Sequence, residues 1–277
     1  MKIDSSVFTL NNSGGVGYLT FDALSRIPFI HHAFSTRIGE GSATSHPMDF
    51  SFDHGERDAV TANYKLFCKA VGFDYDSLVA SSQDHHTFVR VVTSAEKGIG
   101  IWREKDIMSV DALVTAEPGV TLCTYYADCT PIFFVDTVGR AIGLAHAGWR
   151  GTVAGIAAKV VRTMTESFGT DPGDVVCAVG PNIMKCCYEV DEPCAAEFRA
   201  LGLDDSRYLF PKGGGKYMAD MLEANRQILI GAGVKPGNIT VGDLCTKCNS
   251  GLLWSHRATS GDRGTMCAFL RINPTEQ

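Results

Sequence analysis

The stretch from Val120 to Ser167 constrains the fold more than any other part of the sequence. An amphipathic helical pattern occupies its second half, from Thr152 to Phe168. Three apolar, β-rich runs at 121–126, 131–135 and 141–147 precede it and are predicted to be strands. Strands followed by a helix predict an α/β unit in which Cys129 lies at a break in regular structure and His146 at the end of a strand.

Strand and helix patterns alternate along the rest of the chain, without internal repeats or a low-complexity linker. We therefore predict a mixed α/β fold with layered sheets and a single domain over residues 1–277. The further predicted elements are an edge hairpin within 1–30, strands within 78–92, 109–115, 175–179 and 238–241, helices over 56–72, 193–201 and 217–230, and a closing hairpin within 252–272.

The charge pattern argues against a nucleic-acid-binding protein, because the net charge is -6 and no block of Lys or Arg stands out. No apolar run reaches the roughly 18 residues that a membrane-spanning helix needs. The first ten residues lack the pattern of a signal peptide, so a cytoplasmic location is expected. The 10 cysteines are then expected to be reduced thiols. Among them Cys245 and Cys248 form a C-x-x-C pair without a second such pair, which favours two packed cysteines over a four-thiolate zinc site.

Three side chains have the donor types of a catalytic zinc site, namely His85, Cys129 and His146. Such a site uses three protein ligands and leaves one position open. The long separations in the sequence are compatible with a site assembled by the fold, but equally with a buried thiol and packed histidines. Copper also accepts two imidazoles and one thiolate, whereas a trinuclear copper cluster is disfavoured because the 8 histidines include no H-x-H pair.

Anion binding is predicted at a second feature, the turn from Gly148 to Thr152. Thr152 would cap the following helix, whose free N–H groups favour an anion that Arg150 would reinforce. The alternative is a tight turn that needs glycine, with Trp149 packed in the core. Arg37, at the start of a long loop, is a further candidate for phosphate, or else a solvated loop residue.

The sequence resembles the YfiH family, whose members have been described as laccase-domain or polyphenol oxidase proteins and as purine nucleoside phosphorylases. The resemblance spans nearly the whole chain. It rests on the motifs FSTR at 34–37, QDH at 83–85, DALVT at 111–115, ADCTP at 127–131, GLAHAGWRGT at 143–152, GPNI with CYEV within 180–190, CT at 245–246 and SHR at 255–257.

The resemblance implies a metal site made of His85, Cys129 and His146, most simply for zinc and less readily for copper. It implies phosphorolysis of adenosine, inosine, guanosine and methylthioadenosine, together with deamination of adenosine. It also implies a fold related to the catalytic domain of cytotoxic necrotizing factor. Purine nucleosides and phosphate are then the expected partners, and a homodimer is compatible with the sequence, which does not fix the oligomeric state.

Roles for the remaining candidates follow from these reactions. Arg37, Arg150 and Thr152 are the candidates for phosphate, and Gln83 is expected to contact substrate. Asp128 would move protons or orient a ligand histidine, or would simply cap backbone groups. Three other functions stay open: a metal-free hydrolase with Cys129 as nucleophile and His146 as base, a copper-dependent polyphenol oxidase, and a metal-stabilised binding protein.

Overall fold

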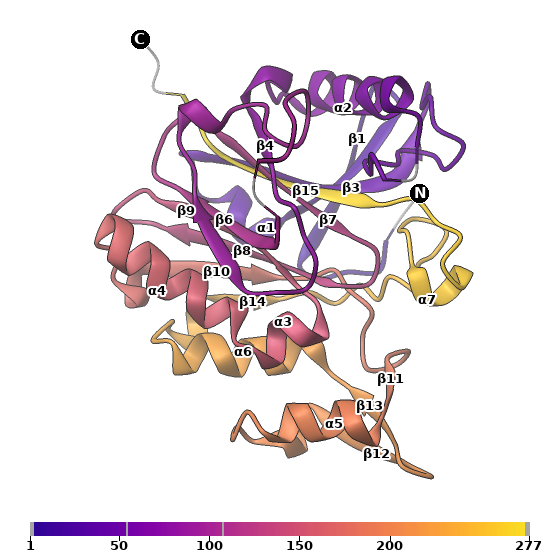
Figure 1. The fold of residues 1–277 in the computed structure, drawn as a ribbon, viewed down its shortest axis with the longest axis vertical. Helices are drawn as coiled ribbons and strands as arrows, with labels where there is room; N and C mark the ends of the chain where they lie inside the picture. The colour runs from indigo at the N-terminus through magenta and orange to yellow at the C-terminus, as the bar shows by residue number, and fades with distance from the viewer. Residues whose placement is uncertain (1–2, 54, 107, 275–277) are drawn as a thin grey trace.

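The computed structural model describes residues 3–53, 55–106 and 108–274, and two six-stranded sheets form its centre (Figure 1). The first sheet has the order β1 (Phe8–Ser13), β2 (Val16–Phe21), β3 (Ile30–Gly39), β15 (Met266–Ile272), β7 (Thr121–Tyr126) and β4 (Leu78–Ala80). The second has the order β14 (Ile239–Val241), β10 (Val175–Val179), β8 (Thr130–Asp136), β9 (Ile142–Ala147), β6 (Val110–Thr115) and β5 (Phe88–Val91).

The two sheets pack face to face, and strand β8 shows why. Its side chains alternate between two faces, as those of any strand do. Phe133 and Val135 join a core that includes Leu270 of the first sheet. Ile132 and Phe134 enter a separate core on the outer face of the second sheet. Every residue of β8 is therefore buried, which explains why its sequence is an almost continuous apolar run.

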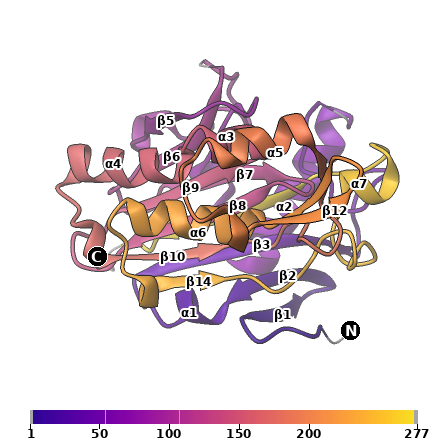
Figure 2. The same ribbon diagram turned by 90° about the horizontal axis from the view of Figure 1, so that it is seen from below.

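Helices cover the outer face of each sheet. Helix α2 (Arg57–Val71) packs its apolar face on the first sheet. Helices α4 (Ile156–Phe168) and α6 (Met221–Gly231) cover the second sheet, as seen from below in Figure 2. The layers thus follow the order helix, sheet, sheet, helix, and the predicted mixed α/β class is confirmed.

A small module projects from one end of the molecule (Figure 1). It has a three-stranded sheet with its own apolar core, built from β11 (Glu189–Asp191), β13 (Lys216–Ala219) and β12 (Leu209–Gly213) beside helix α5 (Glu192–Arg199). The short elements are α1 (Asp22–Ser25), α3 (Trp149–Val153), α7 (His256–Thr259) and the 3-10 turns Tyr75–Ser77, Ser94–Glu96, Pro172–Asp174, Asp205–Arg207 and Pro236–Asn238.

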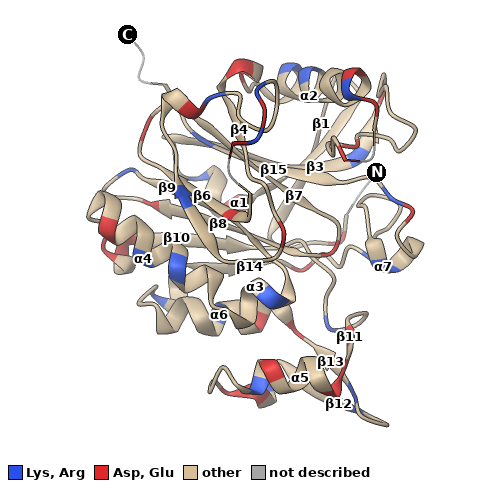
Figure 3. Ribbon diagram, viewed as in Figure 1, with Lys and Arg blue, Asp and Glu red and all other residues tan. Residues whose placement is uncertain are grey.

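Acidic and basic positions are interspersed along the same helices, in agreement with the absence of one-signed blocks in the sequence (Figure 3). In the part of the chain that the structure describes, none of the helices is both long and apolar enough to span a bilayer.

Three predicted elements differ from the structure. The helix expected over Thr152–Phe168 is divided, because Gly155 adopts a left-handed conformation (φ 76°) between α3 and α4. The helix expected from residue 217 begins only at Met221, after strand β13, where Asp220 caps it. The closing hairpin is wrong, since only β15 pairs within a sheet and the preceding residues form turns and α7.

The cysteines of the C-x-x-C pair are not isolated. Cys186 and Cys187, in the turn after β10, lie with Cys245 and Cys248, and the four sulfur atoms are all within 4.8 Å of one another. The expectation that no further cysteines complete this pair is therefore wrong. Spacing could not reveal the cluster, because the two halves are brought together by the parallel pairing of β10 with β14 and by the bridge between Asn182 and Cys245.

The pH dependence of stability should reflect His32, which is buried in the core beside Phe133. Burial, together with neighbouring His31, lowers the pKa of His32 to about 3, and its Nε2 accepts a hydrogen bond from the Phe21 N–H at 2.9 Å. Since an unfolded histidine titrates near 6.5, the unfolded state binds the extra proton first as pH falls. The free energy of unfolding should therefore drop by about 1.4 kcal/mol per pH unit between roughly pH 6 and 4 from this residue alone.

Urea unfolding at several pH values tests this expectation. His32→Gln keeps an acceptor for the Phe21 N–H but cannot titrate, so its stability should vary less steeply with pH than that of the wild type. His256→Gln, at an exposed position, is the control and should retain the wild-type slope. Equal slopes for wild type and His32→Gln would contradict the assignment.

Candidate functional site

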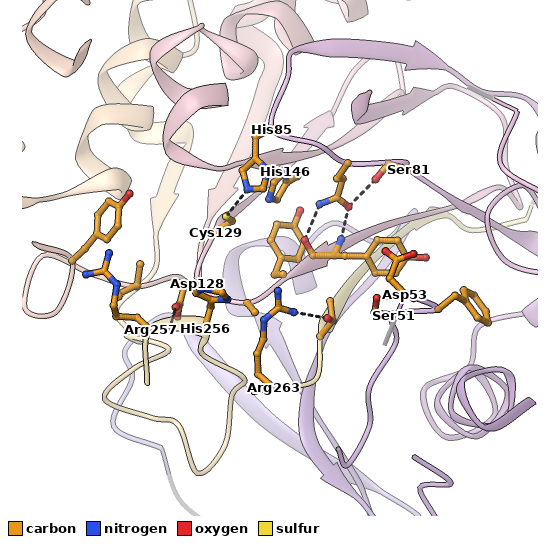
Figure 4. Close-up of a pocket in the computed structure, with 18 of the residues that line it drawn as sticks. Ser51, Asp53, Ser81, His85, Asp128, Cys129, His146, His256, Arg257 and Arg263 are labelled. Carbon is orange, nitrogen blue, oxygen red and sulfur yellow. Dashed lines mark hydrogen bonds between the residues drawn. The ribbon is translucent and has the colours of Figure 1, made fainter. Parts of the chain in front are cut away.

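A cavity of about 460 Å³ opens where the two sheets meet the loops that follow their strands (Figure 4). Its walls come from the loops after β3 and β4, the end of β7, strand β9, the turn after β10, helix α7 and the approach to β15. The lining residues are Ser51, Phe52, Asp53, Ser81, Gln83, His85, Lys105, Tyr125, Tyr126, Ala127, Asp128, Cys129, His146, Ile183, Tyr188, His256, Arg257, Arg263 and Thr265.

His85, Cys129 and His146 come together at one wall of this cavity, with their donor atoms all within 4.8 Å of one another. The Cys129 Sγ lies 3.7 Å from the His85 Nε2. Gly148 leaves the space for this arrangement, because a Cβ atom at its position would lie 2.5 Å from the His85 Cδ2. The juxtaposition of the three predicted ligands is thus present in the fold.

Asp111 on β6 orients both histidines, and it is fully buried. One carboxylate oxygen accepts a hydrogen bond from the His146 Nδ1 at 2.8 Å and another from the His85 backbone N–H at 3.1 Å. The second oxygen accepts the His86 backbone N–H at 2.8 Å. With Nδ1 occupied, the other ring nitrogen of His146 is free for a metal, as in the carboxylate–histidine pairs of zinc sites.

The electrostatics of the cluster favour a thiolate. Burial acts to raise the pKa of Cys129, but the facing His146 and His85 outweigh it and lower that pKa to about 6. Burial likewise acts to lower the pKa of His146, whereas Cys129 and Asp111 raise it to about 9. Negative charge on sulfur is therefore stabilised in this cluster, and a thiolate is the form of cysteine that binds metals.

The donor set fits a borderline divalent cation. Two imidazoles and one thiolate suit zinc, and they also suit a single copper ion. Only three protein donors converge, and they face an open cavity, so a substrate or water can reach a fourth position. Elsewhere in residues 3–53, 55–106 and 108–274, the structure shows no second group of histidines of the kind a trinuclear copper cluster needs.

Asp128 joins the cavity to three loops. Its backbone adopts a left-handed conformation (φ 86°). Its carboxylate accepts hydrogen bonds from the Thr246 hydroxyl at 2.6 Å and the Arg257 backbone N–H at 2.7 Å. Its carbonyl accepts the Ile183 N–H at 3.0 Å. Of the roles considered for Asp128, the structure shows the capping of backbone groups, while the orientation of a ligand histidine falls to Asp111.

Gln83 lines the cavity, but its amide is engaged with protein groups. It donates to the Tyr125 carbonyl at 2.8 Å and accepts the Tyr125 N–H at 2.6 Å and the Ser81 hydroxyl at 2.8 Å. These bonds fix the loop that carries His85 against strand β7.

The three residues predicted for phosphate do not line this cavity. The Arg37 guanidinium stacks 3.7 Å over Trp254 and donates to the Ser250 carbonyl. Arg150 lies 4.3 Å over its neighbour Trp149. Thr152 is fully buried inside α3, not at its start, so the predicted cap is wrong. Its hydroxyl contacts Asn225 of α6 instead.

Other basic side chains line the cavity instead, namely Lys105, His256, Arg257 and Arg263. The SHR motif at 255–257 was the available signal for two of them. No sequence signal pointed to Arg263, because the residues around it were predicted to form a hairpin. Burial lowers the pKa of Arg263, against the opposing effect of Asp49, and a guanidinium remains charged at neutral pH.

Comparison with known proteins shows which family the chain resembles over most of its length. Residues 31–273 match the family model described as multi-copper polyphenol oxidoreductase laccase. The chain is 35% identical to the purine nucleoside phosphorylase YlmD of Bacillus subtilis over 218 residues, which is 78% of each chain. It is also 36% identical to a purine nucleoside phosphorylase of Deinococcus radiodurans, over 88% of this chain and 89% of that protein.

Solved structures give the same relationship. The crystal structure of YlmD from Geobacillus stearothermophilus superposes with a TM-score of 0.87 at 30% identity, covering 97% of this chain and 99% of that one. The structure of the YfiH protein of Bacillus licheniformis superposes with a TM-score of 0.88 at 30% identity, over 95% and 99% of the two chains.

Proposed function

Because the chain belongs to the YfiH family, we propose that it is a metal-dependent purine nucleoside phosphorylase whose ion is zinc, held by His85, Cys129 and His146. The observation that carries the proposal is the convergence of these three donors on a cavity that also holds cationic and aromatic side chains. A volume of about 460 Å³ falls within the range of small-molecule sites and suits a nucleoside with phosphate. The proposed substrates are adenosine, inosine, guanosine and methylthioadenosine.

In phosphorolysis, a phosphate oxygen forms a bond to the anomeric carbon of ribose while the bond from that carbon to the purine nitrogen breaks. The electron pair of the broken bond passes to the purine, which takes up a proton as it leaves. Arg263 and Arg257 are proposed to hold the phosphate anion against the ribose. Tyr125 and Tyr188 offer rings beside which a purine can stack.

Asp128 acts in this proposal as a positioning residue, because its carboxylate holds the Arg257 backbone and the Thr246 side chain. Cys129 acts as a metal ligand. A zinc ion at the three donors would supply Lewis acidity towards substrate oxygen atoms and water. Adenosine deamination, in which water adds to the purine ring and ammonia leaves, is proposed as a second reaction of the same cavity.

One observation favours a second candidate function. The lowered pKa of Cys129 beside His146 is also what a metal-free thiol hydrolase would need. Elemental analysis separates the two. Zinc near one equivalent at the three donors, lost in a ligand variant, supports the phosphorylase, whereas a metal-free protein whose thiol is rapidly acylated supports the hydrolase.

The direct test is to incubate the zinc-loaded protein with inosine and phosphate. Hypoxanthine and ribose 1-phosphate should form in equal amounts, at a rate that depends on phosphate. Adenosine, guanosine and methylthioadenosine should be tested in parallel, and inosine appearing from adenosine would report the deaminase reaction. If none of these nucleosides is consumed at any phosphate concentration, the proposed function is wrong.

Arg263→Gln should lower kcat/KM for phosphate by about 10- to 100-fold, since a hydrogen bond to a charged group contributes about 1.5–3 kcal/mol. Arg150→Gln is the matched control, because Arg150 lies outside the cavity, and it should leave that value nearly unchanged. Initial rates at varied phosphate measure the difference. A larger loss of kcat/KM for phosphate in Arg150→Gln than in Arg263→Gln would instead indicate that phosphate binds at the turn Gly148–Thr152.

A further inference from the structure

Four cysteines outside the cavity form a second cluster, made of Cys186, Cys187, Cys245 and Cys248. The first two lie in the turn after β10 and the last two in the turn after β14. Their sulfur atoms are all within 4.8 Å of one another. The Cys248 Sγ lies 3.7 Å from that of Cys186 and 3.5 Å from that of Cys187.

These separations fit ligands around one ion. Zinc binds thiolates at about 2.3 Å, so the edge of a regular tetrahedron of sulfur atoms measures about 3.8 Å. A disulfide would need about 2.05 Å. We propose that Cys186, Cys187, Cys245 and Cys248 bind a zinc ion in a closed, all-cysteine structural site, separate from the ion at the cavity.

Backbone groups around the cluster are placed as in such sites. Against the effect of burial, hydrogen bonds to its sulfur from the Met184 and Cys248 backbone N–H groups lower the pKa of Cys245, whereas burial and the neighbouring thiols raise the pKa of Cys186 and raise that of Cys187 to about 11. Binding of the ion displaces the thiol protons to solvent. Four thiolates around one divalent ion leave two negative charges. Lys247 adjoins Cys248 in the sequence, whereas the Lys185 ammonium pairs with Asp220 at 3.0 Å.

The ion would connect a loop that lines the cavity with a second loop that supports the cavity residue Asp128. Ile183 and Tyr188, on either side of the first cysteine pair, line the cavity. Thr246, inside the C-x-x-C turn, donates to Asp128 at 2.6 Å. The small module of β11–β13 begins directly after Tyr188. A closed four-sulfur site therefore acts on the cavity by holding Tyr188 and Asp128 in place, without contacting substrate.

Zinc content of the purified, reduced full-length protein tests the proposal. Wild type should hold about two zinc ions per chain, while Cys129→Ala and Cys248→Ser should each hold about one. The double variant should hold none. Cys194→Ser is the matched control, since Cys194 is a half-buried cysteine outside both clusters, and it should retain both ions.

If Cys248→Ser does not fold, the Cys129→Ala protein gives the answer by itself. One sample of this variant, dialysed as purified, should retain one equivalent of zinc. A second sample, in which Co²⁺ has replaced the zinc, should show strong sulfur-to-cobalt charge-transfer absorption. Three results would each overturn the proposal. The first is a Cys129→Ala protein without any metal, and the second is an equal zinc content in Cys248→Ser and Cys194→Ser. The third is a Cys187–Cys248 disulfide found by mass spectrometry of the native protein. Because Cys129→Ala removes only the cavity ion, failure of this proposal is distinguishable from failure of the proposed function.

Discussion

Cys129→Ala is expected to abolish phosphorolysis, with a loss of more than about 100-fold in kcat/KM, together with one equivalent of zinc. Disturbing a residue that merely supports a metal ligand commonly costs 10- to 100-fold, and this substitution removes a ligand itself. It also leaves the neighbouring rings of His85 and His146 without a thiolate beside them. Initial rates with inosine and phosphate, measured beside zinc content, check both parts.

Two controls sharpen this experiment. Cys194→Ser should keep full activity, because Cys194 lies outside the cavity. Removing metal from the wild type with a chelator should reproduce the loss, and adding Zn²⁺ back should restore activity in the wild type but not in Cys129→Ala. Full activity in a protein shown to be free of metal would favour the thiol hydrolase instead.

Asp111→Asn is expected to lower zinc affinity and activity by about 10- to 100-fold with Cys129 intact. The amide keeps one acceptor oxygen, but its NH2 group only donates, so it cannot accept the His146 N–H and the backbone N–H groups of both His85 and His86 as the two carboxylate oxygens do. The imidazole then loses its fixed tautomer, and the loop that carries His85 loses its anchor. Competition with a chromogenic chelator measures the affinity.

Asp136→Asn is the matched control for this variant. Asp136 is also buried in the second sheet, and its carboxylate accepts the backbone N–H groups of Val138 and Gly139 far from the metal ligands. It should lower the melting temperature without changing zinc affinity. If Asp111→Asn changed only stability, the role of Asp111 in orienting the ligands would be wrong.

The predicted layers followed from the apolar periodicity of the strands. Runs such as 131–135 could be read because β8 is buried on both faces. The face-to-face packing of two separate sheets could not be predicted, because an apolar run shows that a strand is buried but not whether a sheet or a helix covers it. The split between α3 and α4 was missed for a local reason, since the left-handed turn at Gly155 interrupts a pattern whose apolar side chains continue on both sides.

The metal ligands were predicted from the family resemblance, because their spacing in the sequence is not characteristic. The residues that support them were less visible. Asp111 stands out in the sequence only as part of the DALVT motif, and nothing in one sequence pairs it with His146, which lies three strand connections later in the chain. The four-cysteine cluster was missed because it joins two turns whose proximity depends on the pairing of β10 with β14.

Strand β15 carries a consequence for the order in which the protein is made. It lies between β3 and β7, pairing with both, although it comes from residues 266–272. While the chain emerges from a ribosome, β3 and β7 have no partner between them until residues 266–272 are released. The strand that precedes Cys129 pairs with β4 earlier but gains its second neighbour only then, so the cavity should become able to retain a metal ion only after residues 266–272 have emerged and paired.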